Sequence, residues 1–360
     1  FMKRLRDTQT IRSASIAAIP LSLSIFSGHA QISLIVCIAI FTYSVWHLKH
    51  SNHKLKWLAL ITYTAVLTIG ISAIFVFPSI EMSQYTHRAN YTYEEASRFN
   101  VPLEGLIGMI SPLLYGRGAQ HFWPGWDRVE LGFTGLTTLF LATLGIRLRK
   151  QQTPLLLIAA IGLIVALGNA TPVHKFMYDY LPGFSLLRVP ARFILLTNFS
   201  IAMLACSGLY YWQTNKINNK RVWKALLTIS LLAITLLPLA WYATSQKYPN
   251  SALNTLPISL LVCLITLGSN AIINRRWIIV LLAIELIGLG AWIETDYRHP
   301  EAGYIEGPAV QYLKNQPGPY RIDVAASSWQ PDAPLVHQIE SINGLHNPMI
   351  LAHYDNYYWS

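Results

Sequence analysis

Long apolar runs separated by short charged segments dominate the chain. Unpaired backbone polar groups are not tolerated in hydrocarbon, and the runs lack the apolar/polar alternation of barrel strands, so helices are the expected spanning element. The pattern predicts an all-α polytopic membrane protein with about nine transmembrane helices, of which the first and fifth are short for a span. The runs are residues 14–26, 32–48, 57–77, 131–146, 154–168, 193–212, 225–242, 256–273 and 277–293.

Composition supports this prediction. Charged residues make up 12% of the chain and hydrophobic residues 53%, with a mean hydropathy of +0.36, whereas soluble domains carry about 25% charged residues. The net charge of +10 raises the alternative of a nucleic-acid partner, so the position of the basic residues matters.

The basic residues lie on one side of the predicted membrane. With a cytoplasmic N-terminus, the inside segments hold 16 Lys and Arg in 41 residues, and the short outside loops hold 4 in 42. This asymmetry predicts the orientation, with an extracytoplasmic C-terminus. Fifteen of the 17 acidic residues fall outside. The basic excess is then cytosolic, and we expect no nucleic-acid partner.

Two outside segments are longer than connectors and divide the chain into two predicted parts. Residues 1–293 form a multi-span transmembrane domain with a long extracytoplasmic loop at 78–130, in which residues 101–114 suit a short helix on the membrane surface. Residues 294–360 read as the start of a small extracytoplasmic α/β module, with a helix at 308–315, a turn at 317–319 and a strand at 320–326. We expect this C-terminal segment to be incomplete.

The three cysteines lie far apart in apolar stretches. They are Cys37, Cys206 and Cys263. We interpret them as buried small hydrophobic residues, and not as disulfides or a metal site.

Four ordered motifs carry a family resemblance. Gly28-His29-Ala30-Gln31 lies between two predicted spans, followed by the segments 91–97 (YTYEEAS), 111–116 (SPLLYG) and 181–193 (LPGFSLLRVPARF). Together they resemble the YfhO-type bacterial membrane proteins of the GT-C glycosyltransferase superfamily, in which the first motif is usually Gly-His-Pro-Gln, so Ala30 departs from it. Residues 317–326, with Asn343-Gly344 and Tyr354, resemble the start of the family's extracytoplasmic C-terminal region.

The resemblance implies an enzyme of the bacterial cytoplasmic membrane. Such an enzyme would move a sugar from a polyprenyl-phosphate donor to an envelope polymer, lipid or protein acceptor on the outer face, with membrane lipid as a further partner. The superfamily places its catalytic carboxylate on the first extracytoplasmic loop, but residues 27–31 contain none. Because the chain begins with Phe1 before Met2, we expect a fragment that lacks its first spans and that carboxylate. No catalytic residue is assigned, and the cofactor is open, a divalent metal ion being one option.

The candidate substrate-binding residues lie near the predicted outer interface. Arginine forks suit phosphate oxygens, although these arginines could instead pair with loop carboxylates or lipid headgroups. The two acidic candidates could hold a metal or accept a proton, or simply begin a helix. His29 and Gln31 could bind substrate or cap a helix end. The candidates are His29, Gln31, Arg88, Glu94, Glu95, Arg117, Arg188 and Arg192.

Glu285 is an intramembrane acidic residue near the middle of the last predicted span. A buried carboxylate in a bilayer costs at least about 2.5 kcal/mol, which makes it a functional candidate by default. Because the chemistry belongs at the outer interface, we interpret it as a structural hydrogen-bonding group that contacts a neighbouring span near Ser269 or Asn270.

A non-enzymatic polytopic protein is the alternative function. A transporter or assembly factor for lipid-linked envelope precursors would share the hydrophobic pattern, but transporters concentrate polar residues at the bilayer midplane. Glu285 is the one residue in the predicted spans that places such a polar group near the midplane, which counts against a transporter.

Overall fold

The computed structural model describes residues 1–86, 91–114, 132–146, 152–214, 217–247, 255–290, 299, 301, 304–324, 329 and 333–342. The chain divides into two compact units. The first comprises Phe1–Gln84 and Arg88–Ile293, and the second Tyr85–His87 and Glu294–Ser360. Each unit is described by itself.

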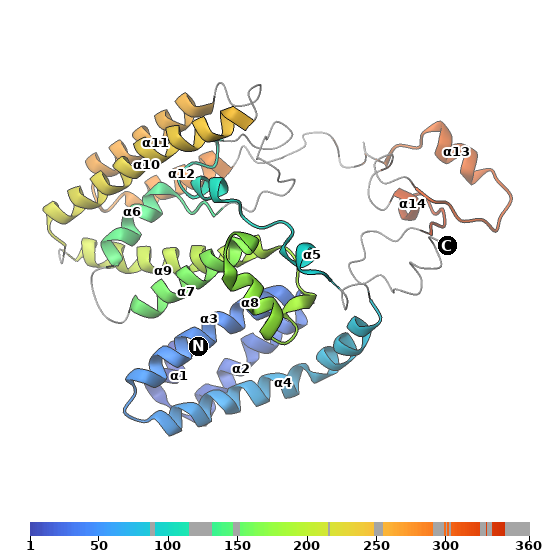
Figure 1. The fold of residues 1–360 in the computed structure, drawn as a ribbon, viewed down its shortest axis with the longest axis horizontal. Coiled ribbons are helices and arrows are strands. Elements are labelled where there is room, and N and C mark those ends of the chain that lie inside the picture. Colours follow the sequence, from blue (N-terminus) through green and yellow to red (C-terminus); the bar gives the residue numbers. More distant parts are fainter. Residues whose placement is uncertain are drawn as a thin grey trace. The chain divides into compact units, whose positions relative to one another are not determined.

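The first unit is a bundle of helices (Figure 1). In its N-terminal part α2 pairs with α4. Helix α3 lies between this pair and the central helices α6, α7 and α9. Helices α10, α11 and α12 pack on the other side of α6. The helices are α1 (Met2–Thr8), α2 (Ile11–Phe26), α3 (Ala30–His50), α4 (Lys54–Gln84), α5 (Tyr93–Ser97), α6 (Leu136–Gly145), α7 (Thr153–Ala166), α8 (Pro172–Tyr180), α9 (Ile194–Gln213), α10 (Asn219–Lys247), α11 (Thr255–Ile272) and α12 (Ile278–Gly290). Short 3₁₀ segments are η2 (Leu103–Met109), η5 (Gly168–Ala170), η6 (Phe184–Leu186) and η7 (Pro190–Phe193).

The helices fit a membrane-embedded protein. Four of those in the described ranges are long and apolar enough to cross a bilayer: Ala30–His50, Lys54–Gln84, Pro190–Gln213 and Asn219–Ala243. Each of the other five predicted runs contains a shorter apolar helix of 10–17 residues. Large apolar side chains face outward, including Ile74 at 81% exposure and Phe41 at 69%, which is typical of a surface in contact with lipid. The structure thus confirms the all-α membrane class, and the count of nine spans stays a prediction.

Small polar residues line the contact between α2 and α4. The hydroxyls of Thr64 and Thr68 bond carbonyls one turn earlier in their own helix, and the Ser22 hydroxyl lies 3.4 Å from the Thr68 carbonyl across the interface. Lipid gives helices no hydrophobic reason to associate, so small side chains that permit close approach stabilise such contacts. A separate apolar cluster joins α1, α2 and α4 through Leu5, Ala14, Trp57 and Leu60.

Helices α6 and α9 approach until their backbones touch. A Cβ atom added to Gly208 would lie 1.9 Å from the Leu141 carbonyl oxygen, and one added to Gly145 would lie 2.2 Å from that of Leu204. No larger residue fits either position without separating the helices. This contact forms the centre of the main apolar core, which includes Phe140 and Phe193.

Three sequence-based predictions need correction. Helix α4 continues through Pro78 to Gln84, beyond the predicted loop start, because proline removes a single backbone bond that a membrane helix tolerates. Residues 101–114 form η2 and turns inside the bundle and not a surface helix, since Ile107 and Leu114 are buried in the main core. Of the cysteines, Cys263 is buried as predicted, whereas Cys37 and Cys206 are exposed; all three are free thiols.

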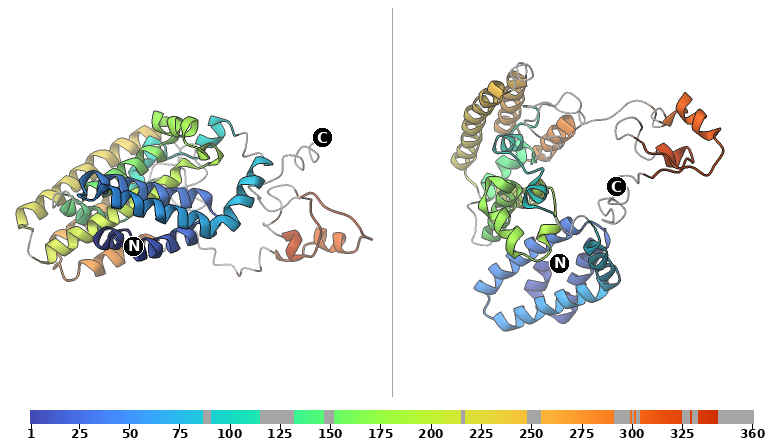
Figure 2. Two further views of the ribbon diagram at one scale, coloured as in Figure 1. Left: turned by 90° about the horizontal axis from the view of Figure 1, so that it is seen from below. Right: turned by 45° about the vertical axis from the view of Figure 1, so that its right-hand side comes forward.

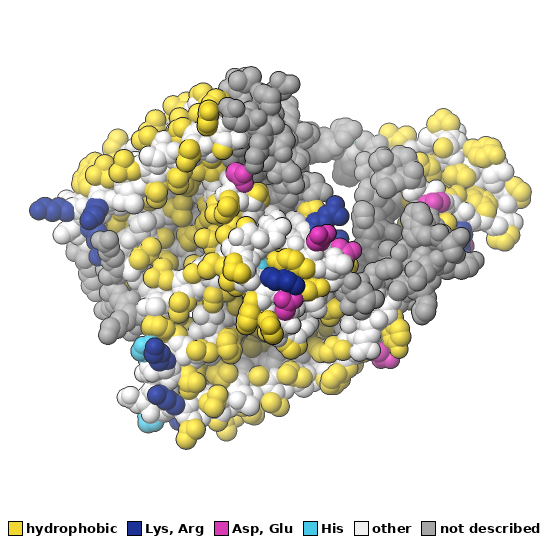
Figure 3. Space-filling view, in the orientation of Figure 1, with side chains coloured by type: hydrophobic (Ala, Val, Ile, Leu, Met, Phe, Trp, Pro, Cys, Tyr) yellow, Lys and Arg dark blue, Asp and Glu magenta, His cyan; other side chains and the backbone are white. Residues whose placement is uncertain are grey.

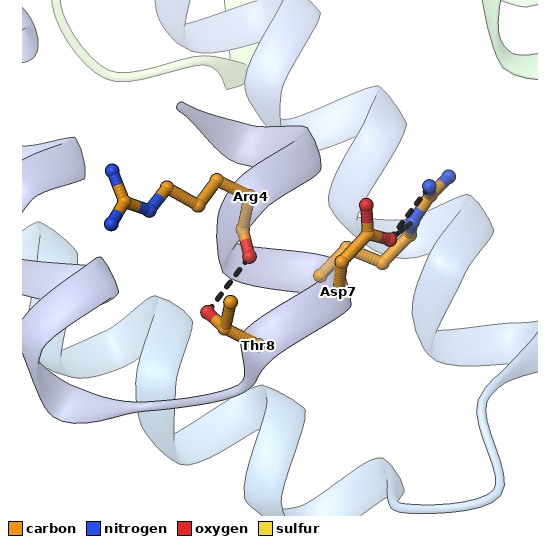
Figure 4. A network of polar contacts seen from close by, with 4 residues as sticks. Arg4, Asp7 and Thr8 are labelled. Carbon is orange, nitrogen blue, oxygen red and sulfur yellow. Dashed lines mark hydrogen bonds and ion pairs between the residues drawn. The ribbon is translucent and has the colours of Figure 1, made fainter.

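Charged groups mark the ends of the helices in the first unit. Figure 3 shows Lys and Arg side chains near the turn between α3 and α4 and near the start of α10, with hydrophobic side chains over the face between them. Helix α1 lies at the same end as the α3–α4 turn and ends where the Thr8 hydroxyl donates to the Arg4 carbonyl at 2.8 Å, beside an Arg6–Asp7 ion pair (Figure 4).

The second unit contains α13 (Pro308–Lys314), α14 (Ala333–Val336) and an isolated parallel bridge between Ile322 and Ser341. The predicted helix at 308–315 is confirmed within one residue. The predicted strand at 320–326 is represented by the bridge alone in the described part of this unit, with the Ile322 N–H donating to the Glu340 carbonyl at 2.9 Å. An α/β module stays a prediction.

Candidate functional site

Arg192 connects two of the sequence motifs. Its Nη1 lies 3.0 Å from His29 Nε2 and 3.1 Å from Gln31 Oε1. The Gln31 amide then donates through Nε2 to the Val189 carbonyl at 2.9 Å. Gln31 is 4% exposed, and its amide links α3 to the segment before α9. Residues more than 150 positions apart therefore form one hydrogen-bonded cluster, which we name the Arg192 cluster: His29, Gln31, Val189 and Arg192.

His29 lies between the start of α3 and Arg192. Its Nδ1 accepts from the Ile32 backbone N–H at 3.4 Å, which is the N-cap contact of α3, and its Nε2 lies 3.0 Å from Arg192 Nη1. A neutral imidazole has one acceptor nitrogen, so each tautomer makes one of these two hydrogen bonds. His29 therefore joins the first turn of α3 to Arg192.

The backbone beside the cluster is strained. Val189 has φ 65° and Phe99 has φ 63°, both left-handed. A β-branched residue rarely adopts this conformation, and such strain costs of order 1–3 kcal/mol per residue. Two contacts stabilise it: the Gln31 amide binds the Val189 carbonyl, and the Ala191 N–H donates to the Phe99 carbonyl at 3.3 Å. Strain maintained by surrounding contacts is common at functional sites.

Two further arginines lie over the ring of Phe99. The Arg98 Cζ is 5.0 Å from the ring centroid and the Arg188 Cζ is 5.7 Å from it. The two guanidinium carbons are therefore at most about 11 Å apart. Both side chains are exposed, and within the described ranges neither donates to a carboxylate or a carbonyl. We name Arg98 and Arg188 the arginine pair.

The segment after Phe99 is tied to the end of α7. Asn100 Nδ2 donates to the Leu167 carbonyl at 2.9 Å and to Asn169 Oδ1 at 2.7 Å. Gly168 has φ +53°, and a Cβ there would lie 2.5 Å from the Asn100 Cβ, so the turn requires glycine at this position. Phe99 is thus fixed from both sides, by Ala191 and by α7.

The segment 91–97 packs on α8 and η6. His174 is 2% exposed, and its ring contacts Tyr93 and Phe184 at centroid distances of 5.7 and 5.3 Å. Burial lowers the pKa of His174 to about 4, so the imidazole is neutral in the folded protein. The Tyr178 hydroxyl donates to the Tyr91 carbonyl at 2.5 Å and completes the contact.

The two acidic candidates belong to the start of α5. Glu95 forms a capping box with Thr92: its Oε2 accepts from the Thr92 N–H at 2.7 Å, and its own N–H donates to the Thr92 hydroxyl at 3.3 Å. Glu94 is exposed. In the described ranges, no group of three His, Cys, Asp or Glu side chains is placed to hold a metal ion.

Glu285 holds the N-terminus of α6. Its two oxygens accept from the backbone N–H groups of Leu136, at 2.5 Å, and Thr137, at 3.1 Å. Asn270, which the sequence suggested as its partner, instead donates to the Thr137 hydroxyl at 3.0 Å. A carboxylate suits this place because it satisfies N–H groups that a helix start leaves unpaired and faces the positive end of the helix dipole.

Sequence reasoning found part of this arrangement. His29, Gln31 and Arg192 lie together, and Arg188 is linked to them through the backbone. Arg88 and Arg117 lie outside the described residues. No sequence signal marks Phe99, because its left-handed backbone depends on contacts with distant segments. Arg98 is absent from the sequence-based candidates because its proximity to Arg188 depends on that same ring.

Comparison with known proteins adds no assignment: no family model matches the chain, and no curated protein or solved structure matches it at a significant level.

Proposed function

We propose that the protein binds a phosphate-linked lipid at the arginine pair and acts as a GT-C type glycosyltransferase, moving a sugar from a polyprenyl-phosphate donor to an envelope acceptor. The observation that carries the proposal is the placement of Arg98 and Arg188 on one aromatic ring without an anionic partner in the described ranges. Two exposed guanidinium groups on the same ring favour the binding of an anion beside them.

The Arg192 cluster supports this function by fixing the positions of its neighbours. Arg192 is bound by His29 and Gln31, and Gln31 also holds the carbonyl of Val189, the residue directly after Arg188. Arg192 is therefore a positioning residue. In the orientation predicted from the charge distribution, the Arg192 cluster and the arginine pair both lie on the extracytoplasmic side, where a lipid-linked donor presents its phosphate.

The chemical role of the arginines would be electrostatic. When the bond between sugar and phosphate breaks, negative charge grows on the departing phosphate, and preplaced guanidinium groups stabilise that charge. The acceptor hydroxyl loses its proton to a general base as its oxygen bonds to the sugar, and arginine cannot fill that role because a guanidinium has no acceptor.

Transfer and binding can be measured separately with the same reconstituted protein. Proteoliposomes receive a polyprenyl-phosphate donor with a labelled sugar together with envelope material, and both donor retention and label transfer are recorded. We expect Arg188→Ala to weaken donor retention by about tenfold or more, since a charge-assisted contact contributes about 1.5–3 kcal/mol. The matched control is Arg276→Ala, an exposed arginine after α11.

The outcomes distinguish the two function classes. Label transfer that falls with Arg188→Ala supports the enzyme, whereas retention without transfer by any donor favours the transporter or assembly factor. Equal retention by wild type, Arg188→Ala and Arg98→Ala would overturn the phosphate-binding proposal itself.

A further inference from the structure

An apolar groove of about 730 Å³ runs between α3, α7 and α8. On α3 its wall extends from Ile38 to Lys49, about 16 Å at the rise of an α-helix. On α7 it includes Leu157 and Ile161, and on α8 Phe176. Apart from Thr42, Lys49 and the polar atoms of two aromatic side chains, the lining is hydrocarbon and thioether.

The two ends of the groove differ, and Lys49 marks the charged one. Lys49 lies in the last turn of α3 with an exposed ammonium group, and Trp46 beside it stacks on His50 at a centroid distance of 4.2 Å. Tryptophan and lysine together are typical of the membrane interface. Helix α8 begins shortly after α7 ends, so Phe176 enters from the end opposite Lys49.

We propose that this groove binds one acyl chain of an anionic bilayer phospholipid, with the phosphate of its headgroup at Lys49. The groove's length of about 16 Å along α3 matches the thickness of one leaflet, which is half of a hydrocarbon core about 30 Å thick. Lys49, the cationic residue in the described lining of the groove, supplies the complementary charge for a phosphate. The inference depends on the membrane placement of α3 and is independent of the glycosyltransferase proposal.

A lipid held in the groove would connect α3 to α7 and α8. Helix α3 begins at the Arg192 cluster and ends at Lys49, and the groove lies along the side of α3 that faces α7. A chain filling the groove would bury apolar surface on both helices and would stabilise their contact.

Native mass spectrometry of the purified full chain tests the proposal. The probes are palmitoyl-oleoyl phosphatidylglycerol and phosphatidylcholine, added separately to the detergent-solubilised protein. We expect one phosphatidylglycerol to be retained per chain in preference to phosphatidylcholine. Lys49→Ala should reduce that preference about fivefold, the effect of one lysine near a membrane surface. Lys54→Ala, an exposed lysine at the start of α4 outside the groove, should leave it unchanged.

A second pair of variants tests occupancy of the groove. Val45→Trp fills the groove beside Trp46 and should abolish retention, whereas Val66→Trp on the exposed face of α4 should not. Retention of both lipids to the same degree, or full retention by Val45→Trp, would overturn the proposal. A dimer that forms without bound lipid and disappears in Val45→Trp would also overturn it, because the occupant would then be a second copy.

Discussion

Replacing Glu285 tests whether an intramembrane carboxylate is structural. Glu285→Gln keeps the shape of the side chain but removes its charge and leaves one oxygen to accept where there were two. At least one of the N–H groups of Leu136 and Thr137 then loses its hydrogen bond. Glu285 is only 7% exposed, so water does not readily replace that bond. We therefore expect a less stable protein, because the start of α6 is no longer fully satisfied.

The expected magnitude follows from these two bonds. A hydrogen bond to a charged group contributes about 1.5–3 kcal/mol, and the favourable position at a helix N-terminus contributes up to about 2 kcal/mol when partly buried. Loss of one bond and of the charge predicts a decrease of about 2–4 kcal/mol in the free energy of unfolding. Glu285→Ala, which removes both acceptors, should cost more.

Thermal unfolding of the detergent-solubilised protein measures the effect, with sugar transfer or donor retention recorded on the same samples. The control is Glu81→Gln, an exposed carboxylate at the end of α4. We expect lower melting temperatures in the order Glu285→Gln and then Glu285→Ala, with function kept below the melting temperature. Unchanged stability combined with lost function would refute the structural role and make Glu285 a functional residue.

Three more predictions concern packing and charge. Gly208→Ala should destabilise the protein by about 2 kcal/mol or more because its Cβ would overlap a backbone oxygen 1.9 Å away; Gly70→Ala, with open space around it, should be neutral or stabilising in the same denaturation assay. His174 is neutral when folded, with a pKa of about 4 against the usual 6.5, so lowering the pH from 7 should begin to destabilise the protein near pH 6.5, and the loss should stop near pH 4 after about 3 kcal/mol. An identical pH slope in His174→Phe would contradict this. Gln31→Ala should cost about 1–3 kcal/mol by leaving the buried Val189 carbonyl unpaired; unfolding of Gln84→Ala, at an exposed position, is the comparison, and equal stability of the two variants would refute the role of Gln31.

Hydrophobic patterning predicts the helices because it records which segments avoid water. The run at 57–77 lies inside α4, and the run at 193–212 nearly coincides with α9. Patterning is weaker at helix ends. The run at 131–146 yields only the ten residues of α6, since Gly135 has φ +96° and helical geometry begins after it.

The site could be predicted as a set of residues but not as an arrangement. His29, Gln31 and Arg192 are conspicuous as polar residues at the ends of apolar runs, yet their contact depends on α3 and the segment before α9 meeting in three dimensions. Phe99 and Val189 have left-handed backbones, which local propensity argues against. Tertiary contacts override that propensity, so a single sequence gives no sign of it.

The separation of polar groups in the first unit favours one function class over the other. Inside the bundle, Glu285 and Asn270 are hydrogen-bonded to the start of α6, which accounts for them as structural groups. At the end of α5 and in the segment between η6 and η7, by contrast, Arg98 and Arg188 are exposed and lie beside strained backbone. A transporter needs its binding groups near the midplane, whereas an enzyme that acts on a lipid phosphate needs them at the interface. The arrangement of these side chains therefore favours interfacial chemistry, and the response of donor retention to Arg188→Ala is the measurement on which that preference depends.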